Sequence, residues 1–135
     1  MKSKAAISII LFITPIFVAC SQDVKLKQYI AKGEELYLAN CIHCHQADGS
    51  GLAAVIPPVN SDFSIKNKAF SICVIKNGLQ GEIEVEGQTY NGNMPSVAFT
   101  DLELAELITY LNNSWGKQES ITTISEVEDA LKNCR

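Results

Sequence analysis

The clearest periodic stretch of the sequence is LELAELITYLNNSW, residues 102–115. Thr100, just before it, and Glu103 within it have the spacing of a capping box, which predicts the first turn of a helix. The same spacing at Ser125 and Glu128 predicts a short helix in the C-terminal tail. Apolar residues recur within the stretch at steps of three and four, which predicts one buried helix face. They are Leu104, Leu107, Ile108, Leu111 and Trp115.

Two other segments have helical spacing. Apolar residues between positions 26 and 40 fall on one side of a helix, whereas residues 24–32 suit either a tether or the first turns of that helix. Residues 68–76 form the second pattern, and the Asn-Gly pair that follows is a natural C-terminal stop. The expected apolar side of this second helix consists of Phe70, Cys73 and Val74.

Residues 81–92, GEIEVEGQTYNG, have the alternation of a β-hairpin. Ile83 and Val85 alternate with glutamates, and Gly87 marks the turn. With 135 residues, the chain has the length of one domain. We therefore predict a mostly α-helical fold, in which three to four helices accompany one short hairpin.

The first nineteen residues are organised like a signal peptide. Lys2 and Lys4 precede the apolar run AAISIILFITPIFVA, which is short for a membrane span. Cys20 follows, as in a bacterial lipobox, where the cysteine becomes the lipidated N-terminus; an ordinary signal peptidase site nearby is the alternative. Residues 20–25 then form a tether. The protein is expected to be exported, and anchored by lipid on the periplasmic side of a bacterial membrane.

The charge of the chain is acidic. The net charge is −4, and removal of the signal peptide leaves 9 basic against 15 acidic residues, or −6. This balance argues against a nucleic-acid partner, because phosphates attract basic proteins. It favours a protein partner with a basic docking surface.

The segment Cys41-Ile42-His43-Cys44-His45 matches Cys-x-x-Cys-His, the haem attachment motif. Two cysteines three apart on a helical turn project to the same side, where each can add to one vinyl group of a porphyrin. The next residue, His45, then brings its imidazole to the iron. His43 lies inside the motif and is interpreted as a variable filler.

Two other chemistries use cysteines at this spacing. A structural zinc site needs four ligands in two close pairs, but only Cys73 and Cys134 remain beyond the motif, and they are far apart in sequence. A thioredoxin-like dithiol follows a strand, whereas the segment before Cys41 has helical spacing. Covalent haem is therefore the favoured interpretation.

The second axial position of the iron decides the function of a haem protein. Met94 is the only methionine besides Met1, and it lies in YNGNMPSV, which is expected to be a loop between the hairpin and the capped helix. We interpret Met94 as the ligand opposite His45; a partly buried core methionine is the alternative. A thioether ligand raises the reduction potential, as an electron carrier requires.

Residues 26–116 resemble a class I c-type cytochrome. In that family a glycine and an aromatic residue stand eight and four positions before the first haem cysteine, where the first helix crosses the last. Gly33 and Tyr37 occupy those positions, and Tyr110 is the matching aromatic residue of the last helix. Segments such as IPPV and LITYLNNSWG resemble small monohaem modules that serve quinoprotein dehydrogenases, copper nitrite reductases and terminal oxidases.

The resemblance implies further site residues. The carbonyl of a proline about twelve residues after the axial histidine accepts the other imidazole N–H, and Pro57 or the adjacent Pro58 would fill this role. Tyr90 would hydrogen-bond a haem propionate. Independently of the resemblance, a buried macrocycle needs apolar walls, and these are expected to include Val55, Ile56, Leu79, Val85 and Tyr90; ordinary core positions are the alternative for each.

The remaining cysteines are open to two interpretations. If lipid takes Cys20 and haem takes Cys41 and Cys44, Cys73 and Cys134 are left over. In an oxidising compartment they can form a disulfide. Alternatively, Cys73 is a small buried residue and Cys134 is a loose end.

Taken together, the residues predict a monohaem cytochrome c that carries single electrons between larger redox proteins and is not itself an enzyme. A dehydrogenase, a reductase or a terminal oxidase would be its partner, and the carrier would be a monomer. The alternative is a haem enzyme subunit or gas sensor in which Met94 is labile and leaves the iron open.

Overall fold

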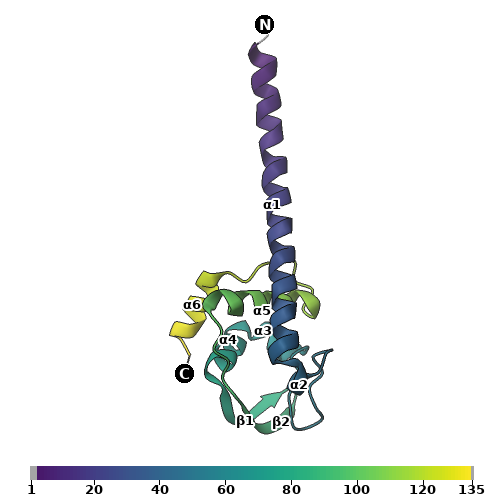
Figure 1. The fold of residues 1–135 in the computed structure, drawn as a ribbon, viewed down its shortest axis with the longest axis vertical. Coiled ribbons are helices and arrows are strands. Elements are labelled where there is room, and N and C mark those ends of the chain that lie inside the picture. Colours follow the sequence, from purple (N-terminus) through teal and green to yellow (C-terminus); the bar gives the residue numbers. More distant parts are fainter. Residues whose placement is uncertain (1–2, 135) are drawn as a thin grey trace.

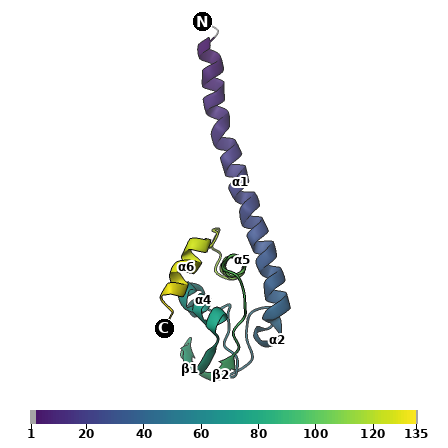
Figure 2. The same cartoon turned by 60° about the vertical axis from the view of Figure 1, so that its left-hand side comes forward.

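Two helices cross at the centre of the fold. α1 (Ser3–Asn40) lies across α5 (Asp101–Ser114), and only the C-terminal part of α1 packs on the rest of the chain (Figures 1 and 2). At the crossing, a Cβ on Gly33 would lie against the carbonyl oxygen of Glu106 and 2.6 Å from the Cβ of Tyr110. The rings of Tyr37 and Tyr110 are 5.7 Å apart. Glycine thus permits the close approach that the resemblance implied.

The computed structural model describes the backbone of residues 3–134 and the side chains of residues 22–134. The predicted lipidation site, Cys20, lies outside the residues whose side chains are described. Residues 24–32, which suited either a tether or the first turns of a helix, are helical in the structure, and α1 also includes residues 20–25, the predicted tether. Within the described part of the chain, no helix combines the length and apolarity needed to cross a membrane.

The remaining elements follow the predicted order and confirm the mostly helical class. A single turn, α2 (Ile42–His45), follows α1; α3 (Asp62–Lys66) and α4 (Lys68–Asn77) come next. Strands β1 (Leu79–Val85) and β2 (Gln88–Met94) form the antiparallel hairpin, in which Ile83 faces Tyr90 across the ladder. The turn residues Glu86 and Gly87 both have positive φ, +52° and +78°. Such values match the twist of a two-residue hairpin.

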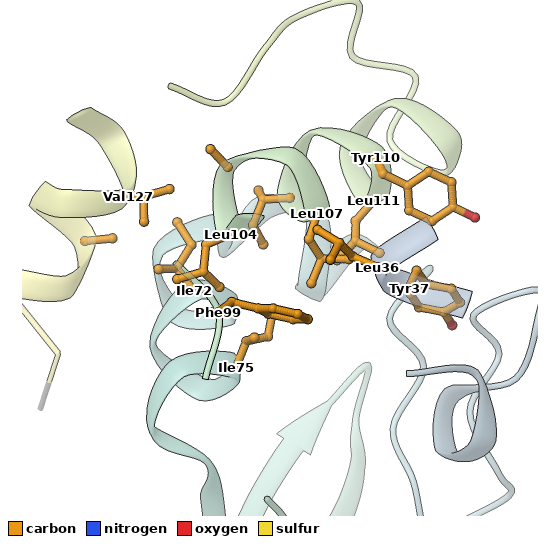
Figure 3. Packing of buried hydrophobic residues seen from close by; sticks show 13 residues of the cluster. Leu36, Tyr37, Ile72, Ile75, Phe99, Leu104, Leu107, Tyr110, Leu111 and Val127 are labelled. Carbon is orange, nitrogen blue, oxygen red and sulfur yellow. The ribbon is translucent and has the colours of Figure 1, made fainter. Parts of the chain in front are cut away.

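One hydrophobic core joins four helices (Figure 3). The predicted buried face of α5 supplies the centre of this core. The predicted capping box of Thr100 and Glu103 is present at the start of that helix. In α4 the residues buried in the core are Ile72 and Ile75. The apolar side predicted for this helix was a different one, and its members Phe70 and Val74 line a cavity instead. The buried cluster consists of Leu36, Tyr37, Ile72, Ile75, Phe99, Leu104, Ala105, Leu107, Ile108, Tyr110, Leu111, Val127 and Ala130.

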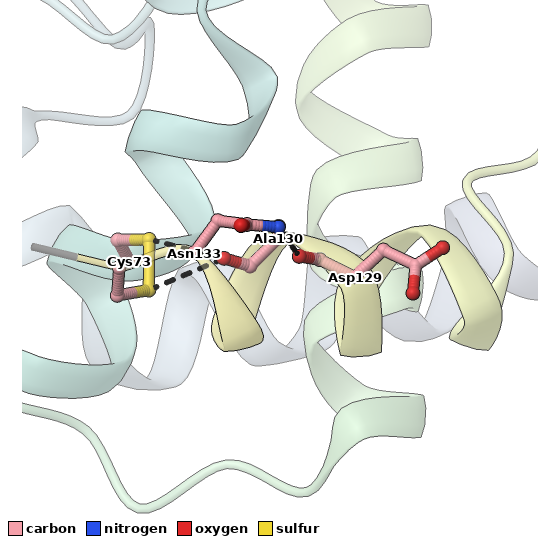
Figure 4. The surroundings of a disulfide bond; sticks show 5 residues. Cys73, Asp129, Ala130 and Asn133 are labelled. Carbon is pink, nitrogen blue, oxygen red and sulfur yellow. Dashed lines mark hydrogen bonds between the residues drawn. A yellow bond between two sulfur atoms is a disulfide. The ribbon is translucent and has the colours of Figure 1, made fainter.

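The C-terminal tail is packed onto the domain through α6 (Ile124–Lys132). The helix is capped by Thr123 and Glu126, two residues earlier than predicted, since this start turns Val127 into the core. Cys73 of α4 and Cys134 are joined by a disulfide with a Cα–Cα distance of 5.6 Å (Figure 4). Residues 117–134 are therefore an integral part of the fold.

Candidate haem site

The attachment motif lies on the turn that directly follows α1. The Cys41 N–H donates to the Tyr37 carbonyl at 2.8 Å, and the Cys41 carbonyl accepts from the His45 N–H at 2.9 Å. The Tyr37 hydroxyl donates to the carbonyl of Gln46 at 2.6 Å and ties the end of the turn to α1. Cys44 is exposed, whereas Cys41 is half-buried against the core. Burial, followed by the nearby Cys44, raises the pKa of Cys41 to about 11, so this thiol is neutral at pH 7.

His45 is buried and held in one orientation. Its Nδ1 lies 3.1 Å from the carbonyl oxygen of Pro57, twelve residues on, in the position that the resemblance implied. Because a carbonyl only accepts, Nδ1 carries the proton and Nε2 keeps its lone pair. Burial lowers the pKa of His45, although the bond to Pro57 opposes this shift. The ring is therefore a neutral imidazole, the form that binds a metal.

The loop after the motif brings Pro57 to the histidine. The Val59 N–H donates to the Gly49 carbonyl at 2.8 Å, which closes the loop. Gly51 has a φ of +72°, and a Cβ there would clash first with the Ile56 carbonyl oxygen and would lie 2.7 Å from the Pro57 carbonyl oxygen. Glycine at this position thus allows the chain to pass directly behind the carbonyl that binds His45. The sequence shows a glycine at position 51, but the reason that a side chain is excluded there is its contact with the Pro57 carbonyl across the loop, which the sequence does not show.

A cavity that is open to solvent lies between the His45 loop and the hairpin. All five predicted wall residues, Val55, Ile56, Leu79, Val85 and Tyr90, line it. Sequence reasoning did not place Phe63 or Phe70 at the site, although their rings, with centroids 5.8 Å apart, line the same cavity. Phe70 was expected only on the apolar side of a helix, and Phe63 belongs to no periodic pattern. His43 is exposed and lies outside the cavity, as expected of a filler.

Met94 lines the same cavity as His45. It is the last residue of β2 and pairs with Leu79, so the expectation that it lies on a loop was wrong; the ladder extends through it. Gly78 ends α4 with a φ of +79°, and a Cβ there would be 2.8 Å from the Met94 carbonyl oxygen. These contacts fix the backbone on which the thioether is carried.

The segment after Met94 is anchored to the end of α4. The Val97 N–H donates to the Ile75 carbonyl at 2.9 Å, and Lys76 Nζ donates to the Phe99 carbonyl at 2.5 Å. Lys76 had no signal in the sequence beyond its place near a helix end. In the structure it holds the segment that leads from the methionine to α5.

The residues around the cavity suit a covalently bound haem. The walls are apolar, as a porphyrin requires, a neutral imidazole and a thioether line the space, and Cys44 stands at its edge. The described residues contain no cluster of three or more His, Cys, Asp or Glu side chains that could hold a metal ion, which disfavours a structural zinc site. The motif follows a helix and not a strand, which disfavours a dithiol of the thioredoxin kind.

Comparison with known proteins agrees with this interpretation. The family model described as cytochrome c matches residues 30–115. Two proteins named cytochrome c-552, one from Thermus thermophilus and one from its strain ATCC 27634, are each 35% identical over 97 residues. The match covers 67% of this chain and 73% and 65% of theirs. The chain belongs to the cytochrome c family. It is a class I c-type cytochrome that carries one covalently bound haem c.

When bound, the haem supplies an iron that changes its charge by one electron. The chain supplies the apolar walls that keep water from the macrocycle and a neutral His45 whose orientation Pro57 fixes. It also holds Met94 on a paired strand. The site is therefore built for electron transfer.

Proposed function

We propose that this protein is a single-electron carrier in which His45 and Met94 are the axial ligands and Cys41 and Cys44 hold the haem through thioether bonds. The observation that carries the proposal is that Met94 lines the cavity that His45 also lines. No other methionine follows the signal segment. A haem with both axial positions filled passes electrons and converts no substrate itself.

The backbone around Met94 favours a stable bond over a labile one. Ladder pairing with Leu79 and close packing against Gly78 limit how far its Cα can move. A fixed thioether stabilises ferrous iron and raises the reduction potential. These contacts support an electron carrier over a gas sensor or a haem enzyme, which both need an open position.

The test compares absorption spectra of the matured wild-type protein and the variants Met94→Ala and Leu79→Ala. We expect the weak red band of a methionine–ferric iron bond in the wild type and its loss, with a high-spin shift, in Met94→Ala. Leu79→Ala is the matched control, because Leu79 pairs with Met94 and lines the same cavity. It should keep the band. Carbon monoxide binding by the reduced wild type at neutral pH would instead favour the sensor.

We further propose that residues 1–19 are removed and that Cys20 becomes the lipidated N-terminus on the periplasmic side. The sequence supports this through its positive start, its apolar run and the cysteine that follows. Mass spectrometry of the mature protein should find two or three acyl chains on Cys20, and Cys20→Ala should leave the membrane fraction. A mature wild-type chain without acyl groups would show that an ordinary peptidase acts nearby.

The partner that we propose is a larger redox protein with a basic docking surface: a dehydrogenase, a reductase or a terminal oxidase. The mature charge of −6 supports this. Val55, which lines the cavity, is 63% exposed, so its apolar side chain can contact the partner beside the haem. Electron transfer to the partner should slow as salt rises. A rate independent of salt would contradict the basic surface.

A further inference from the structure

Asn112 is the one buried side chain among the described residues with an unpaired polar atom. It lies on α5, is 4% exposed, and its Nδ2 has no hydrogen-bond partner. The same side chain lines the cavity that also contains His45 and Met94. A buried donor without an acceptor costs about 1–3 kcal/mol, so such a group in a native fold calls for an explanation.

The neighbouring polar residues of α5 are fully paired. Thr109, which is also buried, donates to the Ala105 carbonyl at 2.7 Å and accepts from the Thr122 N–H at 2.9 Å. Asn113 donates to the carbonyls of Thr109 and Ser120. The helix therefore satisfies its polar side chains wherever protein surrounds them. Asn112 differs because it reaches the cavity.

No described protein atom accepts from Asn112 Nδ2 in the structure. Ser64 and Ser71, which line the same cavity, donate to the carbonyls of Pro58 and Ser64, and Lys68 forms an ion pair with Glu126. A group that fills the cavity can supply the missing acceptor. In a haem c with both axial positions bound, the pyrrole nitrogens face the iron, and the free acceptors are the two propionate carboxylates.

We propose that the Asn112 side-chain amide donates a hydrogen bond to a haem propionate inside the cavity. Asn112 is then a positioning residue for the cofactor, on the wall formed by α5, in addition to the tyrosine expected on the hairpin. An amide donor to an ionised carboxylate partly offsets its charge as felt by the iron. It thereby favours the ferrous state. The inference rests on the bound haem but not on the identity of the electron partner.

The direct test is proton NMR of the reduced, ¹⁵N-labelled holoprotein. The Asn112 side-chain N–H protons should show nuclear Overhauser effects to the methylene protons of one propionate, and they should exchange slowly with water. Contacts only to water, or only to the methyl or meso protons of the macrocycle, overturn the proposal. This measurement uses the wild-type protein and does not depend on whether a variant folds.

The second test measures the reduction potential of Asn112→Leu, which keeps a similar volume without the donor. Asn113→Leu is the matched control, because Asn113 lies next to Asn112 on α5 but does not line the cavity and its amide is paired. We expect the reduction potential to fall in Asn112→Leu, so that the equilibrium of electron exchange with a reference redox protein shifts several-fold toward the oxidised cytochrome. Asn113→Leu should leave the reduction potential unchanged. An unchanged potential in Asn112→Leu, with the haem still attached and the red band intact, overturns the proposal while the proposed electron-carrier site stands.

Discussion

The Nδ1 atom of His45 and the carbonyl oxygen of Pro57 lie 3.1 Å apart, and a glycine stands directly behind that carbonyl. The hydrogen bond assigns the tautomer of the imidazole and so decides which nitrogen is free for the iron. Gly51, whose N–H donates to the His45 carbonyl at 3.0 Å, is thereby also linked to the electronic state of the imidazole that we propose as a ligand. A change at Gly51 should affect both folding and the haem.

We predict that Gly51→Ala destabilises the protein and raises its reduction potential. At a φ of +72°, the new Cβ would clash with the Ile56 carbonyl oxygen and would lie 2.7 Å from the Pro57 oxygen, so that the whole Ile56–Pro57 segment must shift. We expect a loss of about 2–4 kcal/mol, from left-handed strain and overpacking together. A displaced carbonyl bonds the imidazole less well, which makes His45 a weaker donor to ferric iron. Denaturant unfolding and redox titration measure the two effects.

Gly87→Ala is the control for the backbone strain alone. Gly87 has a similar φ of +78°, but no atom lies within 4 Å of the point that a Cβ would occupy there. It should cost about 1–2 kcal/mol and leave the potential unchanged. Equal losses in both variants, with no change in potential, would show that the Pro57 carbonyl is not under pressure from position 51.

A second prediction concerns the crossing of α1 and α5. Alanine at position 33 gains up to about 1 kcal/mol in helix propensity over glycine. It would nevertheless push against the Glu106 carbonyl and the Tyr110 Cβ, at 2.6 Å from the latter. We expect Gly33→Ala to lower the free energy of unfolding by about 1–3 kcal/mol, since the helices must separate. Gly92→Ala, whose Cβ would be 3.5 Å from the Val55 oxygen, should be close to neutral.

Local patterns predicted the elements well, and contacts across the fold account for the errors. The haem motif, the buried face of α5 and the hairpin each depend on residues that are close together in the sequence, so the sequence alone predicted them. The cap of α6 was misplaced because two overlapping pairs have the same spacing, and burial of Val127 selects the earlier one. Met94 was placed on a loop because its flanking turn residues hid the strand pairing. Asn112 gave no signal, because only a cavity makes its amide unusual.

The cap of α6 should make stability depend on acid. Glu126 accepts from the Thr123 N–H at 2.7 Å, and this bond, with the Lys68 ion pair as a smaller cause, lowers the pKa of Glu126. A lowered pKa means that the contribution is present above the unfolded value, about 4.5, and is lost as the pH falls through the folded value. Because the group is partly exposed, we expect less than about 1 kcal/mol.

Thermal unfolding between about pH 6 and 3 checks this cap. Glu126→Gln keeps an acceptor without the charge and should lose less stability on acidification than the wild type. Glu128→Gln, on an exposed position of the same helix, is the control and should follow the wild type. Parallel curves for the wild type and Glu126→Gln would show that the ionised carboxylate adds nothing at this cap.

The final prediction concerns the bond between Cys73 and Cys134, which are 61 residues apart in sequence. In the chain-entropy account, closing a loop of that length stabilises the fold by about 4 kcal/mol. The double variant Cys73→Ser, Cys134→Ser should lose about that much while keeping the methionine–iron band, because neither residue lines the cavity. Val127→Ala, with the disulfide intact, is the comparison for weakened packing of α6 alone and should cost about 2 kcal/mol.

Thiol titration of the unfolded holoprotein without reductant decides whether the bond exists. With Cys20 acylated, Cys41 and Cys44 in thioether bonds and the last two cysteines paired, no thiol should react. Two reactive thiols would mean that Cys73 and Cys134 are free, and the loss in the double variant would then reflect serine at partly buried positions. If the titration finds none but the variant keeps its stability, the packing of Val127 and Ala130 alone holds α6 in place.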